Sequence, residues 1–195
     1  MYPLAQEPKK IRARVKRYER ALRKEQETFG GISDGAGKRY LIAPLYLLLD
    51  DVDAALAAFA WYEQTFPDDM GETGHFLCWT LALYRAGQID AAADKLRQTM
   101  LSNLYVIPYL LGEPVEKLDF WHGSNWEEPS YLAEIPPEYF DLWDGAALQW
   151  LEDTYHSAAL QQVRERYIAL NVQLSTEPRG PKRSQLVKQL FAMRE

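Results

Sequence analysis

The sequence predicts an all-α protein built from helical hairpins, with extra helices at its N- and C-terminal ends. Two segments, 50–55 and 87–92, match at an offset of 37 residues, and each joins two apolar, helix-like runs. A period in the thirties with the order helix, tight turn, helix is typical of a helical-hairpin array. Helical periodicity also covers 9–29 and resumes at Glu138, which supplies the additional helices.

The composition is that of a soluble globular chain that is long enough to bury a core. The 195 residues fit one domain or one short repeat array, and an apolar content of 47% excludes wholesale disorder. Cys78 is the only cysteine, so neither an intrachain disulfide nor a cysteine-based zinc site can form. No apolar stretch reaches the roughly 18 residues that cross a bilayer, and the N-terminus lacks a signal-peptide core. We therefore expect a cytoplasmic protein.

The net charge of −6 is unevenly distributed along the chain. The segment from Pro8 to Lys24 contains nine Lys or Arg residues and one acid, Glu19, so it carries +8. The remainder must then carry −14 to give the total of −6. The sequence therefore combines a basic N-terminal arm with an acidic body.

The basic arm has the pattern of an amphipathic helix from about Lys9 to Phe29. Its apolar residues follow the spacing i, i+4, i+7 and i+11, namely Ile11, Val15, Tyr18 and Leu22. Gly30 and Gly31 should end this helix, because glycine permits a left-handed cap. The segment 30–37 holds four glycines and is expected to form a flexible loop.

The two matching segments define the expected hairpins. Runs 40–49 and 75–84 are predicted as the first helices, and a second helix follows each turn. Asp53 and Asp90 are expected to accept hydrogen bonds from the free amides that open the second helices. A small residue just inside each second helix, Ala55 or Ala92, would let the paired helices approach closely.

These residues resemble the tetratricopeptide repeat family. The family pattern has a small residue in the first helix, a turn residue, packing residues in the second helix and a proline at the end. The first unit places Ala43, Asp50, Ala55, Phe59 and Pro67 at these positions, and the second unit places Thr80, Gly87, Ala92 and Leu96. Three positions depart from the family pattern. Asp50 replaces the turn glycine, Leu104 stands where the final proline would fall, and Pro44 lies inside the first helix, where it should kink the helix or delay its start.

A narrower similarity involves residues 103–112 and 143–151, which resemble a group of tetratricopeptide-like proteins related to a tumour-suppressor-type module. The combined resemblance covers roughly 38–155. By the family's geometry, the first helices line a concave protein-binding side, which would contain Tyr40, Leu47, Leu48, Leu77, Leu81, Tyr84 and Arg85. Alternatively, the helices after Glu138 cover this side and make its residues core. The family's carboxylate clamp is not expected, because Tyr40 and Pro44 replace its Lys and Asn.

The rest of the chain divides at its prolines and glycines. Residues 113–137 read as irregular, and Pro137 is expected to open a helical region that breaks near His156 and ends at Leu174. Ser184 is expected to cap a last short helix after a linker. The expected organisation is therefore a basic helix and loop, two hairpins, an irregular connection with packing helices, and a linker with the last helix, over 1–37, 38–112, 113–175 and 176–195.

No convincing catalytic, metal or cofactor site is predicted. The end of the glycine loop, Gly37-Lys38, fails as a phosphate loop, because Gly37 lies six positions after Gly31, where the motif needs five, and Arg39 replaces the Ser or Thr that holds magnesium. The histidines are too scattered for a metal triad. We therefore expect a non-enzymatic protein-protein interaction module, such as an adaptor, a scaffold or an inhibitor or immunity-type binder, that binds an unidentified protein.

Two alternatives stay open. The basic helix could bind nucleic acid through Lys9, Lys10, Arg12, Lys16 and Arg20, although the acidic body would repel a polyanion. The same face could instead be solvated, or pair with the acidic body of this chain or of a neighbouring copy. A membrane role is disfavoured, because the apolar stripe lacks Trp and Phe. The second alternative is an enzyme with an unrecognised site among His122, Glu127, Glu128 and His156.

Overall fold

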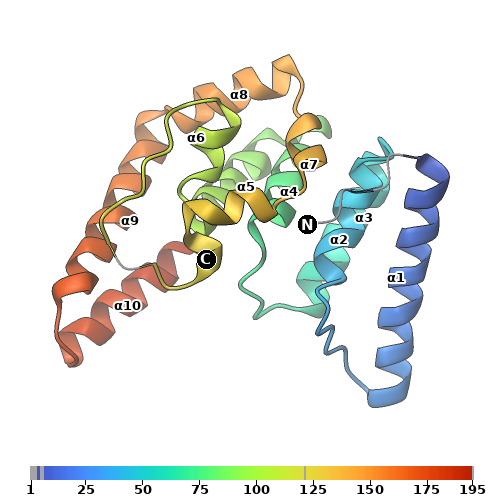
Figure 1. The fold of residues 1–195 in the computed structure, drawn as a ribbon, viewed down its shortest axis with the longest axis horizontal. Helices are drawn as coiled ribbons and strands as arrows, with labels where there is room; N and C mark the ends of the chain where they lie inside the picture. The colour runs from blue at the N-terminus through green and yellow to red at the C-terminus, as the bar shows by residue number, and fades with distance from the viewer. Residues whose placement is uncertain (1–3, 5–6, 121, 195) are drawn as a thin grey trace.

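The computed structural model describes residue 4 and residues 7–120 and 122–194, and every regular element in them is helical (Figure 1). The all-α prediction is therefore confirmed for these residues. No helix in this part of the chain is long and apolar enough to cross a membrane. The elements are α1 (Pro8–Phe29), α2 (Arg39–Leu47), α3 (Val52–Thr65), α4 (Thr73–Arg85), α5 (Ile89–Ser102), α6 (Val106–Leu110), η1 (Asn125–Glu127), η2 (Pro129–Glu134), α7 (Pro137–Asp141), α8 (Gly145–Tyr155), α9 (Ala158–Thr176) and α10 (Pro181–Arg194).

Helices α2 with α3 and α4 with α5 form two helical hairpins that pack side by side. Helices α3 and α5 each contain 14 residues. The early alanines of these two helices, Ala55 and Ala92, are completely buried. The small side chains therefore occupy the tight helix-helix contacts that were expected of them.

The turns of the two hairpins have the same backbone geometry. Asp50 and Gly87, which match in the sequence, both have left-handed backbones, with φ of 58° and 73°. The following N–H closes each turn on the carbonyl five residues before it, Asp51 to Tyr46 at 3.1 Å and Gln88 to Leu83 at 3.0 Å. This is the Schellman arrangement of a helix C-terminus. The offset of 37 residues therefore holds for the hydrogen bonds as well as for the sequence.

The helix caps after these turns differ from the prediction. Asp51 caps α3, since its carboxylate accepts a hydrogen bond from the Ala54 N–H at 3.1 Å. Gln88 holds the cap position of α5 and makes no side-chain cap bond. The assignment of Asp53 and Asp90 as cap acceptors was wrong, because each lies at the second position of its helix, two residues after the cap. Their charges still face the positive end of the helix dipole.

Helix α1 agrees closely with its predicted bounds and lies against α2 (Figure 1). Gly30 caps it in the left-handed conformation, with φ of 70°. The predicted apolar stripe faces the body, and its members Ile11, Val15 and Leu22 are buried. Pro44 does not delay α2, which already begins at Arg39.

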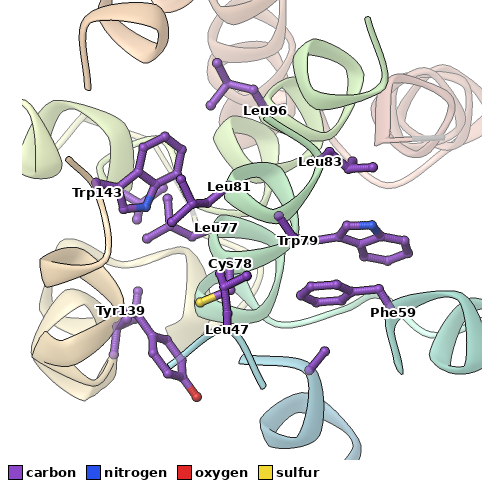
Figure 2. Close-up of a cluster of buried hydrophobic side chains, with 14 of the residues drawn as sticks. Leu47, Phe59, Leu77, Cys78, Trp79, Leu81, Leu83, Leu96, Tyr139 and Trp143 are labelled. Carbon is purple, nitrogen blue, oxygen red and sulfur yellow. The ribbon is translucent and has the colours of Figure 1, made fainter. Parts of the chain in front are cut away.

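Helix α4 is the centre of the core and contacts α2, α3, α5, α7 and α8. On one side, the Trp79 ring stacks on Phe59 with centroids 4.9 Å apart (Figure 2). On the opposite side, Tyr139 and Trp143 approach Leu77 and other α4 residues (Figure 2). A helix that is apolar on all sides is expected to be buried in this way.

The C-terminal region follows the predicted breaks, with one correction. Helix α7 begins at Pro137, and α8 and α9 are separated at His156 and Ser157. The Ser157 hydroxyl caps α9. Ser184 does not cap the last helix, because α10 already begins at Pro181. The Ser184 hydroxyl instead donates to the Gly180 carbonyl at 3.3 Å.

Candidate functional site

Most of the residues expected on the concave side are covered in the structure. Leu47, Leu77 and Leu81 have no exposed surface, and Tyr40 is 9% exposed, while Leu48 is half-buried. Helices α7 and α8 pack over α4 and close this side. A partner has no access to the buried leucines in this conformation, so an open binding surface has to lie elsewhere.

Tyr84 and Arg85 were also expected on the concave side. They hold α8, and the segment that connects α7 to α8, against the second hairpin. The Tyr84 ring stacks on Trp150 of α8, with centroids 4.8 Å apart. The Arg85 guanidinium donates to the Leu142 carbonyl at 2.6 Å and lies 3.5 Å from the Asp50 carboxylate. These partly exposed side chains are therefore engaged within the chain.

A cleft of about 1180 Å³ lies between the second hairpin and α10. Its floor contains Phe76 and Trp79 from α4 and Lys95 and Gln98 from α5. The end of α3, the segments 66–71 and 123–127, and helices α9 and α10 also line it. These segments are far apart in the sequence and show no common motif, so the cleft was missed by sequence reasoning. Of its lining residues, none was among the predicted protein-binding residues.

Lys95 places a cation on the aromatic floor of the cleft. Its Nζ lies 3.5 Å from the centroid of the Trp79 ring and 5.5 Å from that of Phe76. It also donates to the Gln98 side-chain oxygen at 2.8 Å. Burial lowers the pKa of Lys95, and the nearby Glu63 and Asp94 charges oppose that effect. An ammonium has three donor hydrogens, so a ligand in the cleft can accept a further hydrogen bond.

The loop 66–71 forms a fixed wall of the cleft because Asp69 ties it to α2. The Asp69 carboxylate accepts hydrogen bonds from the Tyr40 hydroxyl and the Arg39 Nε, each at 2.6 Å, and from the Gly71 N–H at 3.0 Å. Burial alone would raise the pKa of Asp69, but the three bonds outweigh it and leave this pKa below its ordinary value. Asp69 is therefore a structural anion of the wall.

The opposite wall of the cleft is formed by the segment 123–127 and helices α9 and α10, and contacts at the C-terminal end of α10 hold these segments together. The Arg194 guanidinium donates to the Glu127 carboxylate at 2.5 Å and also bonds to the Tyr167 hydroxyl of α9. Elsewhere on α10 only Leu186 is buried. The Arg97 guanidinium of α5 also donates to the Met193 carbonyl of α10. This helix is therefore attached by a small apolar cluster and by two arginines at its C-terminal end.

The rim of the cleft exposes apolar side chains and unpaired negative charge. Met70, Trp126 and Phe191 are 54%, 36% and 50% exposed. Glu63 and Asp68 are exposed, and neither forms an ion pair in the described part of the chain. The cleft thus offers aromatic surface inside and a partly acidic, partly apolar edge.

The predicted basic-arm residues form a separate exposed surface on α1. Lys9, Lys10, Arg12, Lys16 and Arg20 are all exposed. Among the cations of α1, Lys10 alone has a carboxylate within 4 Å in the described residues, that of Glu7 at 2.6 Å. The arm therefore packs on the body through its apolar stripe, and most of its exposed cations have no carboxylate partner in the described residues.

Of the residues proposed for an unrecognised enzyme, His122 and Glu128 lie close together, whereas Glu127 and His156 are engaged in other contacts. His122 is buried, its Nε2 lies 2.8 Å from the Tyr105 hydroxyl and its Nδ1 lies 3.7 Å from Glu128. His156 instead pairs with Glu113 at 2.7 Å. Glu127 is bound by Arg194, as described above. No group of three His, Cys, Asp or Glu side chains in the described residues is arranged to hold a metal ion.

The start of α2 is also closed to a phosphate. The Asp34 carboxylate accepts hydrogen bonds from the backbone N–H groups of Lys38 and Arg39, at 2.9 and 2.7 Å. These are the amides that a phosphate would need. Comparison with protein-family models, curated proteins and solved structures gives no match to this chain.

Proposed function

We propose that the chain is a non-enzymatic protein-binding module, and that the cleft beside the second hairpin takes a segment of another protein. The observation that carries the proposal is the cleft of about 1180 Å³, with an aromatic floor and three exposed apolar side chains at its rim. Small-molecule pockets span about 300 to 1000 Å³, so this cleft is suited to a larger ligand. Apolar clefts of helical proteins commonly accept peptide segments.

The hairpins support a tetratricopeptide-like framework for this module. The equal lengths of α3 and α5, the buried Ala55 and Ala92 and the shared turn hydrogen bonds all repeat after 37 residues. About three units are usually needed for a stable array. Helices α1, α8 and α9 supply the packing that two hairpins lack.

The chemistry of the cleft indicates which peptide it would prefer. Apolar side chains of a ligand would cover Phe76 and Trp79, whereas the Lys95 ammonium could donate to a peptide carbonyl. Basic side chains of the ligand would be attracted by the unpaired carboxylates of Glu63 and Asp68 at the rim. The favoured ligand is therefore an apolar segment flanked by Lys or Arg.

A displayed library of random peptides, selected on the purified full chain, tests this proposal. We expect apolar sequences with flanking basic residues to be enriched. The affinity of the best peptide is then measured by fluorescence anisotropy. Phe191→Ala should then weaken binding about tenfold, as loss of a buried aromatic contact does. The matched control is Phe29→Ala, since Phe29 is an exposed Phe outside the cleft.

Two results would overturn the proposal. One is a library that yields no peptide above background. The other is a peptide whose affinity falls equally in the Phe29→Ala and Phe191→Ala variants. A Glu63→Lys variant checks the charge preference separately, because it should weaken basic peptides and leave neutral ones unchanged.

A further inference from the structure

The second surface is the exposed face of α1, which has a regular charge pattern. Counting from Lys9, its cations recur at i+3, i+7, i+11 and i+14, and they lie along one side of the helix: Lys9, Arg12, Lys16, Arg20 and Arg23. At a rise of 1.5 Å per residue, this row is about 21 Å long. Arg17 and Lys24 widen the row on one side and are also exposed. Glu27 interrupts the face only near the last turn.

Two of the three carboxylates of α1, those of Glu19 and Glu25, are bound by residues of the body. The Glu19 carboxylate accepts a hydrogen bond from the Tyr46 hydroxyl at 2.8 Å. The Glu25 carboxylate accepts one from the Asp34 N–H at 2.9 Å. The fold therefore separates the charges of α1, and the cations remain together on the outer side.

The acidic body does not cancel this face. Helix α1 lies at one edge of the molecule, beside α2 (Figure 1). Its apolar stripe is buried, and its row of cations is exposed. At physiological ionic strength, charges separated by more than about 8 Å of solvent are largely screened. The repulsion expected from a total of −14 therefore weakens at the outer side of α1.

We infer that the exposed face of α1 binds the phosphate backbone of a nucleic acid. The face has a long row of charge and no exposed apolar side chain between Lys9 and Lys24 larger than Ala13. Such a surface complements a ligand of uniform negative charge, as in sequence-independent backbone binding. Exposed Arg12, Arg20 and Arg23 can form bidentate bonds with phosphate oxygens.

Other polyanions fit the same face less well. Insertion into a membrane interface needs a free apolar side, but Ile11, Val15 and Leu22 are buried against the body. An acidic protein partner would ordinarily bury apolar side chains in the core of its interface. The exposed face of α1 offers none over its basic length.

Fluorescence anisotropy with a labelled DNA duplex and a labelled RNA strand tests the inference on the full chain. We expect micromolar binding at low salt. If five phosphates are neutralised, the slope of log K against log salt should be about −4.5 for the duplex and about −3.5 for the single strand. The triple variant Arg12→Glu, Lys16→Glu, Arg20→Glu should lose about 100-fold in affinity. Its circular dichroism should stay unchanged, because these side chains are exposed.

A charge-matched control separates a local surface from a general effect of net charge. Arg166, Arg179 and Lys188 are exposed and form no ion pair in the described residues. Reversing these three to Glu should change affinity by less than about threefold, although the net charge changes equally. Equal losses in both triple variants would contradict the inference.

Three further results would also overturn it. The first is the absence of any nucleic-acid binding at low salt. The second is that poly-glutamate displaces the labelled probe as effectively as unlabelled duplex does. This result would indicate an acidic protein partner. The third is binding to phosphatidylserine vesicles in preference to both nucleic acids. The Phe191→Ala variant should bind nucleic acid normally, since the cleft and the basic face are separate.

Discussion

The imidazole Nδ1 of His75 lies 3.1 Å from the backbone carbonyl of Tyr40, and this contact compensates for Pro44. Pro44 stands four residues after Tyr40 in α2 and has no N–H to donate to that carbonyl. Because His75 is fully buried, the contact requires the tautomer with hydrogen on Nδ1. Its Nε2 has no hydrogen-bond partner among the described residues.

A double-mutant cycle tests this compensation. His75→Phe should lower the free energy of unfolding by about 2 kcal/mol, because it leaves the buried Tyr40 carbonyl without a donor. Pro44→Ala restores a backbone N–H at the correct position. In the Pro44→Ala background, the cost of His75→Phe should therefore fall by about 1 kcal/mol. Strictly additive effects in urea denaturation would show that the proline and the histidine are not coupled.

The same histidine should make stability depend on pH. Burial lowers the pKa of His75 from its ordinary 6.5 to about 4 in the folded chain. As pH falls below 6.5, the unfolded chain takes up this proton and the folded chain does not, so the free energy of unfolding decreases down to about pH 4. The loss attributable to His75 is roughly 3 kcal/mol. Urea titrations of His75→Phe should lack this part of the pH dependence, and identical profiles would refute it.

The two equivalent turns predict that introducing a glycine at one and removing the glycine from the other change stability in opposite directions. Asp50→Gly should raise the free energy of unfolding by about 0.5 kcal/mol, because Asp50 holds a left-handed backbone that glycine adopts freely. Gly87→Ala should lower it by about 1 kcal/mol for the converse reason. Asp50→Asn is the control for the exposed ion pair with Arg85. If both Asp50→Gly and Gly87→Ala destabilise the fold in thermal or urea denaturation, the turn geometry is contradicted.

Gly71 is predicted to be essential for the wall of the cleft. A Cβ on Gly71 would lie 2.0 Å from the Phe76 ring, whereas one on Gly112 would meet nothing within 4 Å. Both glycines have left-handed backbones, with φ of 74° and 71°. Gly71→Ala should therefore cost about 2 kcal/mol more than Gly112→Ala, measured by urea denaturation, since only the first forces Phe76 to move. Equal costs would mean that the ring moves freely.

Helix α10 should loosen when the contacts of Arg194 are removed. Arg194→Ala breaks the bonds to Glu127 and Tyr167, so amide exchange in α10 should accelerate about tenfold, as a loss near 1.4 kcal/mol implies. Lys182→Ala removes an ion pair near the start of the same helix, but Lys182 is 72% exposed. That variant should leave exchange almost unchanged. Equal acceleration in both would disprove the special role of Arg194.

The parts of the fold that were predictable from sequence depend on local signals. The 37-residue offset located both turns, and the apolar stripe of α1 with Gly30 gave its bounds. The cap of α3 was misplaced because Asp51 and Asp53 are both plausible acceptors in sequence. Their roles depend on a shift of two residues in the helix start.

The cleft was not predictable because its walls are joined by contacts between distant residues. The Asn103 side chain, for example, donates to the Trp126 carbonyl at 2.7 Å and fixes the irregular segment that carries Trp126. Likewise, Leu81 lies inside the core because α7 and α8 pack over it. A periodic sequence pattern predicts such helices but not where in the fold they pack. Packing between remote segments therefore decided which apolar residues became surface and which became core.

Both outer sides of the hairpin pair are occupied, one by α1 and the other by α8 and α9. In the described residues, the hairpin pair therefore has no bare end face through which copies could stack into a filament. The array is also closed to extension, since a third hairpin added at either end would have to displace a packed helix.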